Sequence, residues 1–302
     1  MKVPVDRRGL LKGAAFALLF APTASSFAMA DDPPLISRDY AGERKSFRTH
    51  LVKPGPAPDD GESLTEPPAE VQLTTYRSGK LELLAWRSAP RGKGKRPAVL
   101  VLHGGNAMGR GHWDLAEPYV RAGYVALVPS VRGENGQAGA FSGFYDEVDD
   151  VLAAGRKLAA EPDVDPARLF LAGHSIGGTL TMLAAMTGTL FRGASPLSGS
   201  PNAFAFFNRY PEDVRFDATN PREFQMRSAV CYATSFKCPT LIQHSGTPAQ
   251  AGPIADLTAS RARAAGLKVE SISVPGDHFT AIPGQIQNSL AFFAELGSGA
   301  KG

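Results

Sequence analysis

A serine flanked by glycines near the middle of the chain is a candidate nucleophile. Residues 173–177 read Gly-His-Ser-Ile-Gly, a G-x-S-x-G box centred on Ser175, and Gly178 follows directly. Residues 168–172 are predicted to form a buried strand and residues 179–186 a helix of small side chains. A serine at such a strand-to-helix turn takes strained backbone angles, so the residues two positions away on each side must be small. The pattern predicts a hydroxyl that projects from the sheet edge for acyl transfer.

Acyl transfer also needs donors for the negative charge that develops on the substrate oxygen. A buried apolar run at residues 99–102 leads into residues 103–106, which read His-Gly-Gly-Asn. Glycines in such a turn free backbone N–H groups to point at a carbonyl oxygen, and the residue after the nucleophile, Ile176, supplies another N–H. We therefore predict an oxyanion hole formed by Gly105, Asn106 and Ile176.

The base must be a histidine that reaches the serine hydroxyl. His278 lies in a loop after the last predicted strand, where the chain order serine, acid, histidine places it. The other histidines lie in the N-terminal segment, at the start of a surface helix, or within or at the ends of strands, and are His50, His112, His103, His174 and His244. We predict His278 as the base.

The serine box, the His-Gly-Gly turn and the late histidine together resemble the α/β-hydrolase fold, and within it the prolyl oligopeptidase and dienelactone hydrolase group of serine hydrolases. The resemblance covers about residues 71–297. It includes an Arg-Gly turn at residues 130–136, an acidic stretch at 163–168 and a strand opening at 238–242. The resemblance implies hydrolysis of esters or peptides, with neither a metal nor an organic cofactor.

The catalytic acid departs from the family pattern. The family places an Asp three or four residues after the turn that follows the next-to-last strand, but residues 244–251 contain no carboxylate. The nearest downstream acid is Asp256, at the start of a predicted helix, where the helix dipole alone also favours a carboxylate. Asp277 is expected to diverge from the adjacent ring. Further candidates precede the next-to-last strand, namely Glu212, Asp213 and Asp217. We take Asp256 as the candidate acid.

The elements that must position these residues alternate along the chain. A hairpin over residues 71–86 precedes short apolar runs that alternate with amphipathic stretches, which is typical of a mostly parallel sheet with helices on both faces. We expect about eight strands. The apolar runs lie at 98–102, 125–128, 169–172, 193–197, 240–243 and 269–274, and the helical stretches at 114–122, 145–160, 179–187, 253–265 and 285–296. Residues 200–237 interrupt the alternation with aromatic clusters, which either form a cap insertion over a pocket or complete the core.

The N-terminal segment has the features of an export signal. Within residues 1–30, a twin arginine at 7–8 precedes an apolar run at 13–22 and a small-residue cleavage site at 28–30. The apolar run is too short for a stable membrane anchor. We expect the bacterial twin-arginine export machinery to deliver the protein to the periplasm or beyond. Residues 31–70, rich in Pro, Asp and Glu, are expected to form an extended arm or linker.

Charge gives little indication of a polyanionic partner. The signal carries four basic residues and one acidic residue, a net charge of +3 that equals the net charge of the whole chain. The remainder of the chain is therefore neutral, and no nucleic-acid surface is expected.

The two cysteines, Cys231 and Cys238, allow a disulfide in an oxidising compartment. Two buried thiols are equally compatible with the sequence. No other metal-ligating residues cluster near them, so no zinc site is expected.

These features favour an exported serine hydrolase that cleaves carboxylic esters through an acyl-enzyme on Ser175, with His278 as base. Peptidases of this family carry a large propeller ahead of the catalytic domain, which about forty arm residues cannot build. A hydrolase of small peptides is the alternative. Because the usual Asp is absent, a weakly active or non-catalytic binding protein on the same scaffold is a further alternative.

Overall fold

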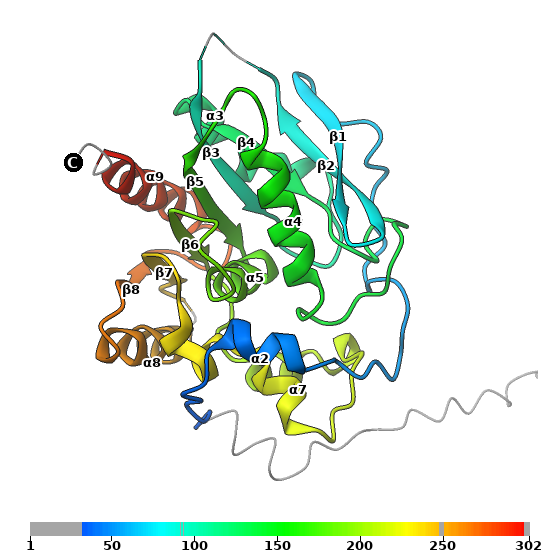
Figure 1. Ribbon diagram of the computed structural model, residues 1–302, viewed down its shortest axis with the longest axis vertical. Coiled ribbons are helices and arrows are strands. Elements are labelled where there is room, and N and C mark those ends of the chain that lie inside the picture. Colours follow the sequence, from blue (N-terminus) through cyan, green and yellow to red (C-terminus); the bar gives the residue numbers. More distant parts are fainter. Residues whose placement is uncertain (1–31, 91, 93, 248–250, 299–302) are drawn as a thin grey trace, which may run out of the picture.

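The computed structural model describes residues 32–298, apart from residues 91, 93 and 248–250 (Figure 1). The export signal predicted for residues 1–30 lies outside the described residues. Within the described part of the chain, no helix is long and apolar enough to span a membrane.

Within the described residues, eight strands form one sheet in the order β1-β2-β4-β3-β5-β6-β7-β8. Strand β2 pairs antiparallel with β1 and with β4, and every other pair of neighbours is parallel. The strands are β1 (Val71–Ser78), β2 (Leu81–Ser88), β3 (Arg96–Leu102), β4 (Val125–Pro129), β5 (Val164–His174), β6 (Gly193–Leu197), β7 (Thr240–Ser245) and β8 (Val269–Val274). The predicted mostly parallel, eight-stranded sheet of the α/β-hydrolase fold is confirmed.

Helices cover both faces of the sheet because the central strands are apolar on both sides. In β3, Leu100 and Leu102 belong to one buried cluster, and Val99 and Val101 belong to another on the opposite face. The first cluster includes residues of α4 (Glu147–Ala159), α5 (Ile176–Ala185) and α8 (Ala251–Ala264), and the second includes residues of α3 (Glu117–Arg121) and α9 (Ile282–Ser298). Figure 1 shows α4 and α5 side by side over one face.

The helix predicted over residues 114–122 is divided in two. A 3-10 helix, η1 (Arg110–Leu115), precedes α3, which begins at Glu117. Pro118 lies in the first turn of α3. Because proline has no N–H and clashes with the preceding turn, it is tolerated at a helix start but interrupts a continuous helix.

The predicted cap insertion, residues 200–237, folds into four short helical segments. They are α6 (Ala203–Arg209), η2 (Pro211–Asp213), α7 (Pro221–Gln225) and η3 (Ala229–Ser235). Five of its phenylalanines are almost fully buried and belong to the main core cluster, namely Phe204, Phe207, Phe216, Phe224 and Phe236. Most of the aromatic content of this segment therefore completes the core.

The arm folds back onto this insertion. It contains a helix, α2 (Tyr40–Ser46), capped by the side chain of Asp39, so the arm is not extended throughout. Figure 1 shows α2 beside α7. Downstream of α2, Leu51 forms an isolated antiparallel bridge with Phe216. The arm is thereby paired through its backbone with the insertion, residues 200–237.

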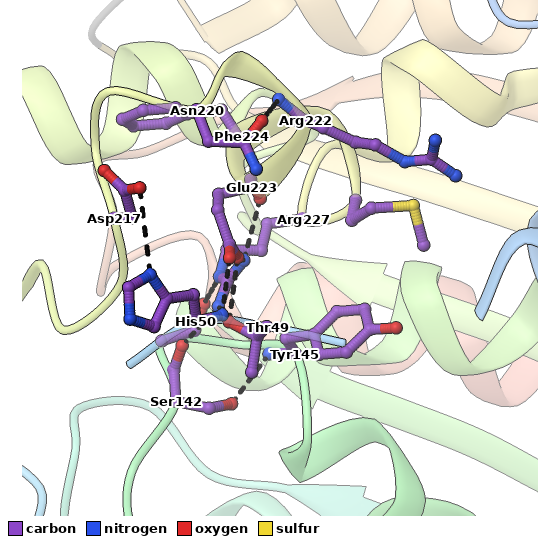
Figure 2. A network of polar contacts seen from close by, with 12 residues as sticks. Thr49, His50, Ser142, Tyr145, Asp217, Asn220, Arg222, Glu223, Phe224 and Arg227 are labelled. Atoms are coloured by element: carbon purple, nitrogen blue, oxygen red, sulfur yellow. Dashed lines mark hydrogen bonds and ion pairs between the residues drawn. The ribbon is translucent and has the colours of Figure 1, made fainter. Parts of the chain in front are cut away.

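A buried ion pair within the insertion binds residues of the arm (Figure 2). The side chains of Arg227 and Glu223 are fully buried and lie 2.6 Å apart. Arg227 donates all five guanidinium N–H groups, to Glu223, to Thr49 Oγ1 and to the carbonyl oxygens of Ser142, Gly143 and Glu223. Glu223 also accepts from the Thr49 hydroxyl at 2.8 Å and from the His50 N–H at 2.6 Å. Arm, insertion and the loop before α4 therefore share one polar centre.

Replacing Arg227 by methionine should destabilise the fold strongly. The change leaves the Glu223 carboxylate buried without a cation, which costs about 3–5 kcal/mol of unfolding free energy. Arg121 forms a largely exposed pair with Glu117 and provides the control, because Arg121→Met should cost less than about 1 kcal/mol. Urea unfolding measures both, and equal losses would show that the buried pair does not hold the arm.

Candidate active site

Ser175 lies at the turn between β5 and α5, in a backbone conformation that is unusual for a residue with a side chain. Its φ is 56° and its ψ is −119°. A Cβ on Gly173 would lie 2.4 Å from the carbonyl oxygen of Gly177, and a Cβ on Gly177 would lie 2.4 Å from the carbonyl oxygen of Leu102. Glycine is therefore required at both positions, and the strand–turn–helix geometry is that of a nucleophile elbow.

The His-Gly-Gly turn that follows β3 lies directly against the elbow. A Cβ on Gly104 would lie 3.2 Å from Ser175 Cβ and 3.2 Å from His174 Nδ1. Gly105 has a φ of 73°, a left-handed conformation that favours glycine. The turn and the elbow thus face each other across a distance that a side chain on Gly104 would fill.

A buried pair, His103 and Glu134, supports this turn. His103 Nε2 lies 3.1 Å from Glu134 Oε2, and His103 Nδ1 lies 3.0 Å from the carbonyl oxygen of Gly104. Burial lowers the pKa of His103, but the charge and hydrogen bond of Glu134 outweigh burial, so the pKa is raised. Each ring nitrogen of His103 faces an oxygen atom, so this environment favours the protonated ring. Glu134 follows β4, the parallel neighbour of β3, and His103 follows β3. This shared edge of the sheet is the sequence feature from which the pair could have been predicted.

The structure does not leave the backbone N–H of Asn106 free for the predicted role of oxyanion donor. Its backbone N–H donates to Asp59 Oδ2 at 2.9 Å, so an arm carboxylate already occupies it. Its side-chain amide donates to Asp213 Oδ2 at 3.4 Å. The N–H groups of Gly105 and Ile176 donate to none of the described residues. Sequence reasoning treated the arm as a separate linker and therefore missed Asp59.

The loop after β8 brings His278 next to the elbow. His174 Nε2 donates to the carbonyl oxygen of His278 at 2.9 Å, and the centroids of the two rings lie 4.6 Å apart. Asp277 accepts from the N–H groups of Phe279 and Thr280 and from the Thr280 hydroxyl. Its carboxylate is therefore used within its own turn, as its divergence from the ring predicts.

The structure does not bring Asp256 to His278. Helix α8 begins at Ala251, so Asp256 lies in its second turn, where it is exposed and makes no hydrogen bond to His278. Two of the alternative acids are occupied elsewhere, since Asp213 accepts from Asn106 and Asp217 accepts from Thr219. Among the described residues, no carboxylate lies within hydrogen-bond distance of the His278 ring. The assignment of Asp256 as orienting acid is therefore not supported.

Of the two alternatives left open for the cysteines, the structure shows two buried thiols and no disulfide between them. Cys231 and Cys238 are both free and buried. Cys231 lies in η3 and Cys238 lies just before β7. Burial raises the pKa of each thiol to about 12, so both stay protonated at neutral pH. The described residues contain no group of three or more His, Cys, Asp or Glu side chains that could hold a metal ion.

Comparison with known proteins agrees with this geometry. Residues 113–247 match the prolyl oligopeptidase family. The chain is 29% identical over 197 residues to an uncharacterized peptidase, YuxL, of Bacillus subtilis. The aligned region covers 59% of this chain and 30% of the Bacillus protein. The chain therefore spans about a third of the length of this curated relative.

Solved structures share the fold at low identity. Pyrococcus horikoshii acylaminoacyl peptidase gives a TM-score of 0.60 at 22% identity and covers 74% of this chain and 40% of its own. A puromycin-hydrolyzing peptidase of Mycobacterium tuberculosis gives 0.62 at 19%, covering 74% and 39%. A putative dienelactone hydrolase of Klebsiella pneumoniae gives 0.54 at 18%, covering 74% and 98%. The chain has the α/β-hydrolase fold and resembles the prolyl oligopeptidase and dienelactone hydrolase group of serine hydrolases.

Proposed function

We propose that the protein is a serine hydrolase that cleaves short peptides, with Ser175 as nucleophile and His278 as general base. The observation that carries this proposal is the strained Ser175 elbow beside the Gly104 turn. The match of residues 113–247 to the prolyl oligopeptidase family favours peptides over esters. The ester hydrolase is the second candidate, because the Klebsiella protein that the chain covers almost completely is described as a putative dienelactone hydrolase.

The proposed reaction follows from the two backbone donors and the histidine. His278 takes the proton of the Ser175 hydroxyl as the oxygen attacks the peptide carbonyl carbon. The N–H groups of Gly105 and Ile176 stabilise the resulting oxyanion. Protonated His278 then gives its proton to the leaving amine as the peptide bond breaks. A water molecule, deprotonated by the same ring, hydrolyses the acyl-enzyme and restores Ser175.

The protonation state of His278 fits a base at neutral pH. Partial burial lowers its pKa, Asp277 opposes the shift, and Arg209 on α6 lowers the pKa further. A lowered pKa keeps the ring neutral and able to accept a proton. However, no carboxylate in the described part of the chain contacts the ring. The imidazolium that forms during the reaction then lacks its usual stabilisation, which is worth up to about four orders of magnitude in turnover. We therefore propose a slow enzyme.

Export through the twin-arginine pathway is proposed on the sequence of residues 1–30 alone. It places the enzyme in the periplasm or outside the cell.

The nucleophile and the substrate class are tested together. The protein should be labelled by a fluorophosphonate and should release p-nitroaniline from aminoacyl anilides. Ser175→Ala should abolish labelling and lower kcat/KM by roughly a thousandfold or more. Ser298→Ala, at the exposed end of α9, should leave both unchanged. Turnover of p-nitrophenyl esters without anilide cleavage would favour the esterase, and folded protein with neither activity nor labelling would favour a binding protein.

Asp256→Asn should leave kcat/KM for the same anilide unchanged. The carboxylate is exposed on α8 and does not contact the base. Steady-state kinetics check this, and a loss of a hundredfold or more, of the size expected for an orienting acid, would restore Asp256 to the catalytic site.

The pH dependence of kcat/KM should reflect the lowered pKa of His278. The base acts when unprotonated, so activity rises with pH through the pKa of His278, and this acid limb should fall below the ordinary histidine value of about 6.5. Arg209→Ala removes a nearby cation that disfavours protonation and should move the limb to higher pH. Arg121→Ala, on α3, should leave the limb in place. A limb that does not respond to Arg209→Ala would rule out this role for the arginine.

A further inference from the structure

No carboxylate of residues 32–298, as far as the structure describes them, contacts the His278 ring, yet the main chain of His278 is held beside the elbow. The carbonyl oxygen of His278 accepts a hydrogen bond from His174 Nε2 at 2.9 Å. His174 immediately precedes Ser175, so a single hydrogen bond links the residue next to the nucleophile with the backbone of the base. The two imidazole rings also pack against each other, with centroids 4.6 Å apart and planes at 45°.

The protonation of His174 suits this contact. Its side chain is almost fully buried, and burial lowers its pKa to about 4 while the His278 carbonyl opposes the shift. At neutral pH the ring therefore carries one proton. Because Nε2 faces a carbonyl oxygen, which only accepts, the proton is assigned to Nε2 and Nδ1 carries none. The tautomer is thus set by the bond to His278.

The other side of the His174 ring meets the oxyanion turn. A Cβ on Gly104 would lie 3.2 Å from His174 Nδ1. The ring is therefore enclosed between the turn that binds the oxyanion and the loop that carries the base. A displacement of this ring would alter the spacing of both loops from Ser175.

We propose that His174 is a positioning residue, which holds the loop of His278 at the distance from Ser175 that proton transfer requires. It does so through the main chain, whereas the family's Asp acts on the histidine ring. Fixing the loop restores the orientation of the base. It does not stabilise the imidazolium, because His174 is neutral. The inference rests on the proposed roles of Ser175 and His278.

Two substitutions separate the hydrogen bond from the ring. His174→Phe keeps an aromatic ring of similar size and removes the N–H. His174→Gln removes the ring and supplies an amide N–H at about the position of Nε2. We expect His174→Phe to lower kcat for the anilide by roughly a hundredfold, the loss typical of a misplacement of about 1 Å, with KM little changed. His174→Gln should keep kcat within about tenfold of the parent, since it keeps the bond.

His244 provides a matched control. Its ring is half-buried and its Nδ1 also lies within hydrogen-bond distance of a backbone carbonyl, that of Ser245, at 3.2 Å. His244→Phe should leave kcat unchanged. Thermal unfolding of each variant confirms that it is folded. If His174→Gln loses as much as His174→Phe, or if His174→Phe retains full kcat, the hydrogen bond is not the positioning contact.

The rate of labelling by a fluorophosphonate serves as a second readout, because it reports on Ser175 and its base independently of the substrate. Absence of labelling in the parent protein would overturn the proposed function itself. Labelling of the parent at a measurable rate, with the same rate in folded His174→Phe, would overturn only the role of His174. The expected result is labelling that slows in His174→Phe in parallel with kcat and recovers in His174→Gln.

Discussion

The close approach of α5 to the end of β3 is the constraint on which the site depends. Gly177, in the first turn of α5, lies so near the carbonyl oxygen of Leu102 that a Cβ would be only 2.4 Å away. This contact places the start of the helix, and with it Ser175, against the turn that follows β3. Backbone strain of the kind at Ser175 costs of order 1–3 kcal/mol and persists only where packing enforces it. Here the N–H of Ser175 also donates to Leu197 in β6, so neighbouring strands on both sides secure the elbow.

Much of the scaffold could be predicted because it is encoded in local patterns. Strands β6 and β8 begin and end where the apolar runs 193–197 and 269–274 place them. The glycines around Ser175 likewise encode a local steric demand. The polar contacts of the site are different, since Asp59 lies 47 residues from Asn106 and Glu134 lies 31 residues from His103. Such pairings follow from strand order and from the docking of the arm, which residue spacing does not reveal.

At His278, two effects that a carboxylate partner usually provides together have different sources. A carboxylate on the ring both orients the imidazole and stabilises the imidazolium. In this protein the orientation of His278 comes from its main chain and from the neighbouring ring of His174. The positive charge of the His278 imidazolium has no paired anion among the described residues. On the other side, His103 and Glu134 form a buried hydrogen-bonded pair below the turn that carries Gly105. The site therefore has a buried polar pair that supports the oxyanion turn and a neighbouring ring that supports the loop of the base.

The buried centre around Arg227 also has a consequence for the order in which the chain folds. Thr49 bonds to Glu223 across 174 residues, and Arg227 reaches back 85 residues to Ser142. Contacts of such separation carry a large loop-closure entropy and slow the folding of a domain. The arm is synthesised before the sheet, but Glu223 and Arg227, the partners of Thr49, follow it by more than 170 residues. The contacts of Thr49 with this centre therefore form late, whereas the Asp59 carboxylate meets its partner Asn106 across only 47 residues.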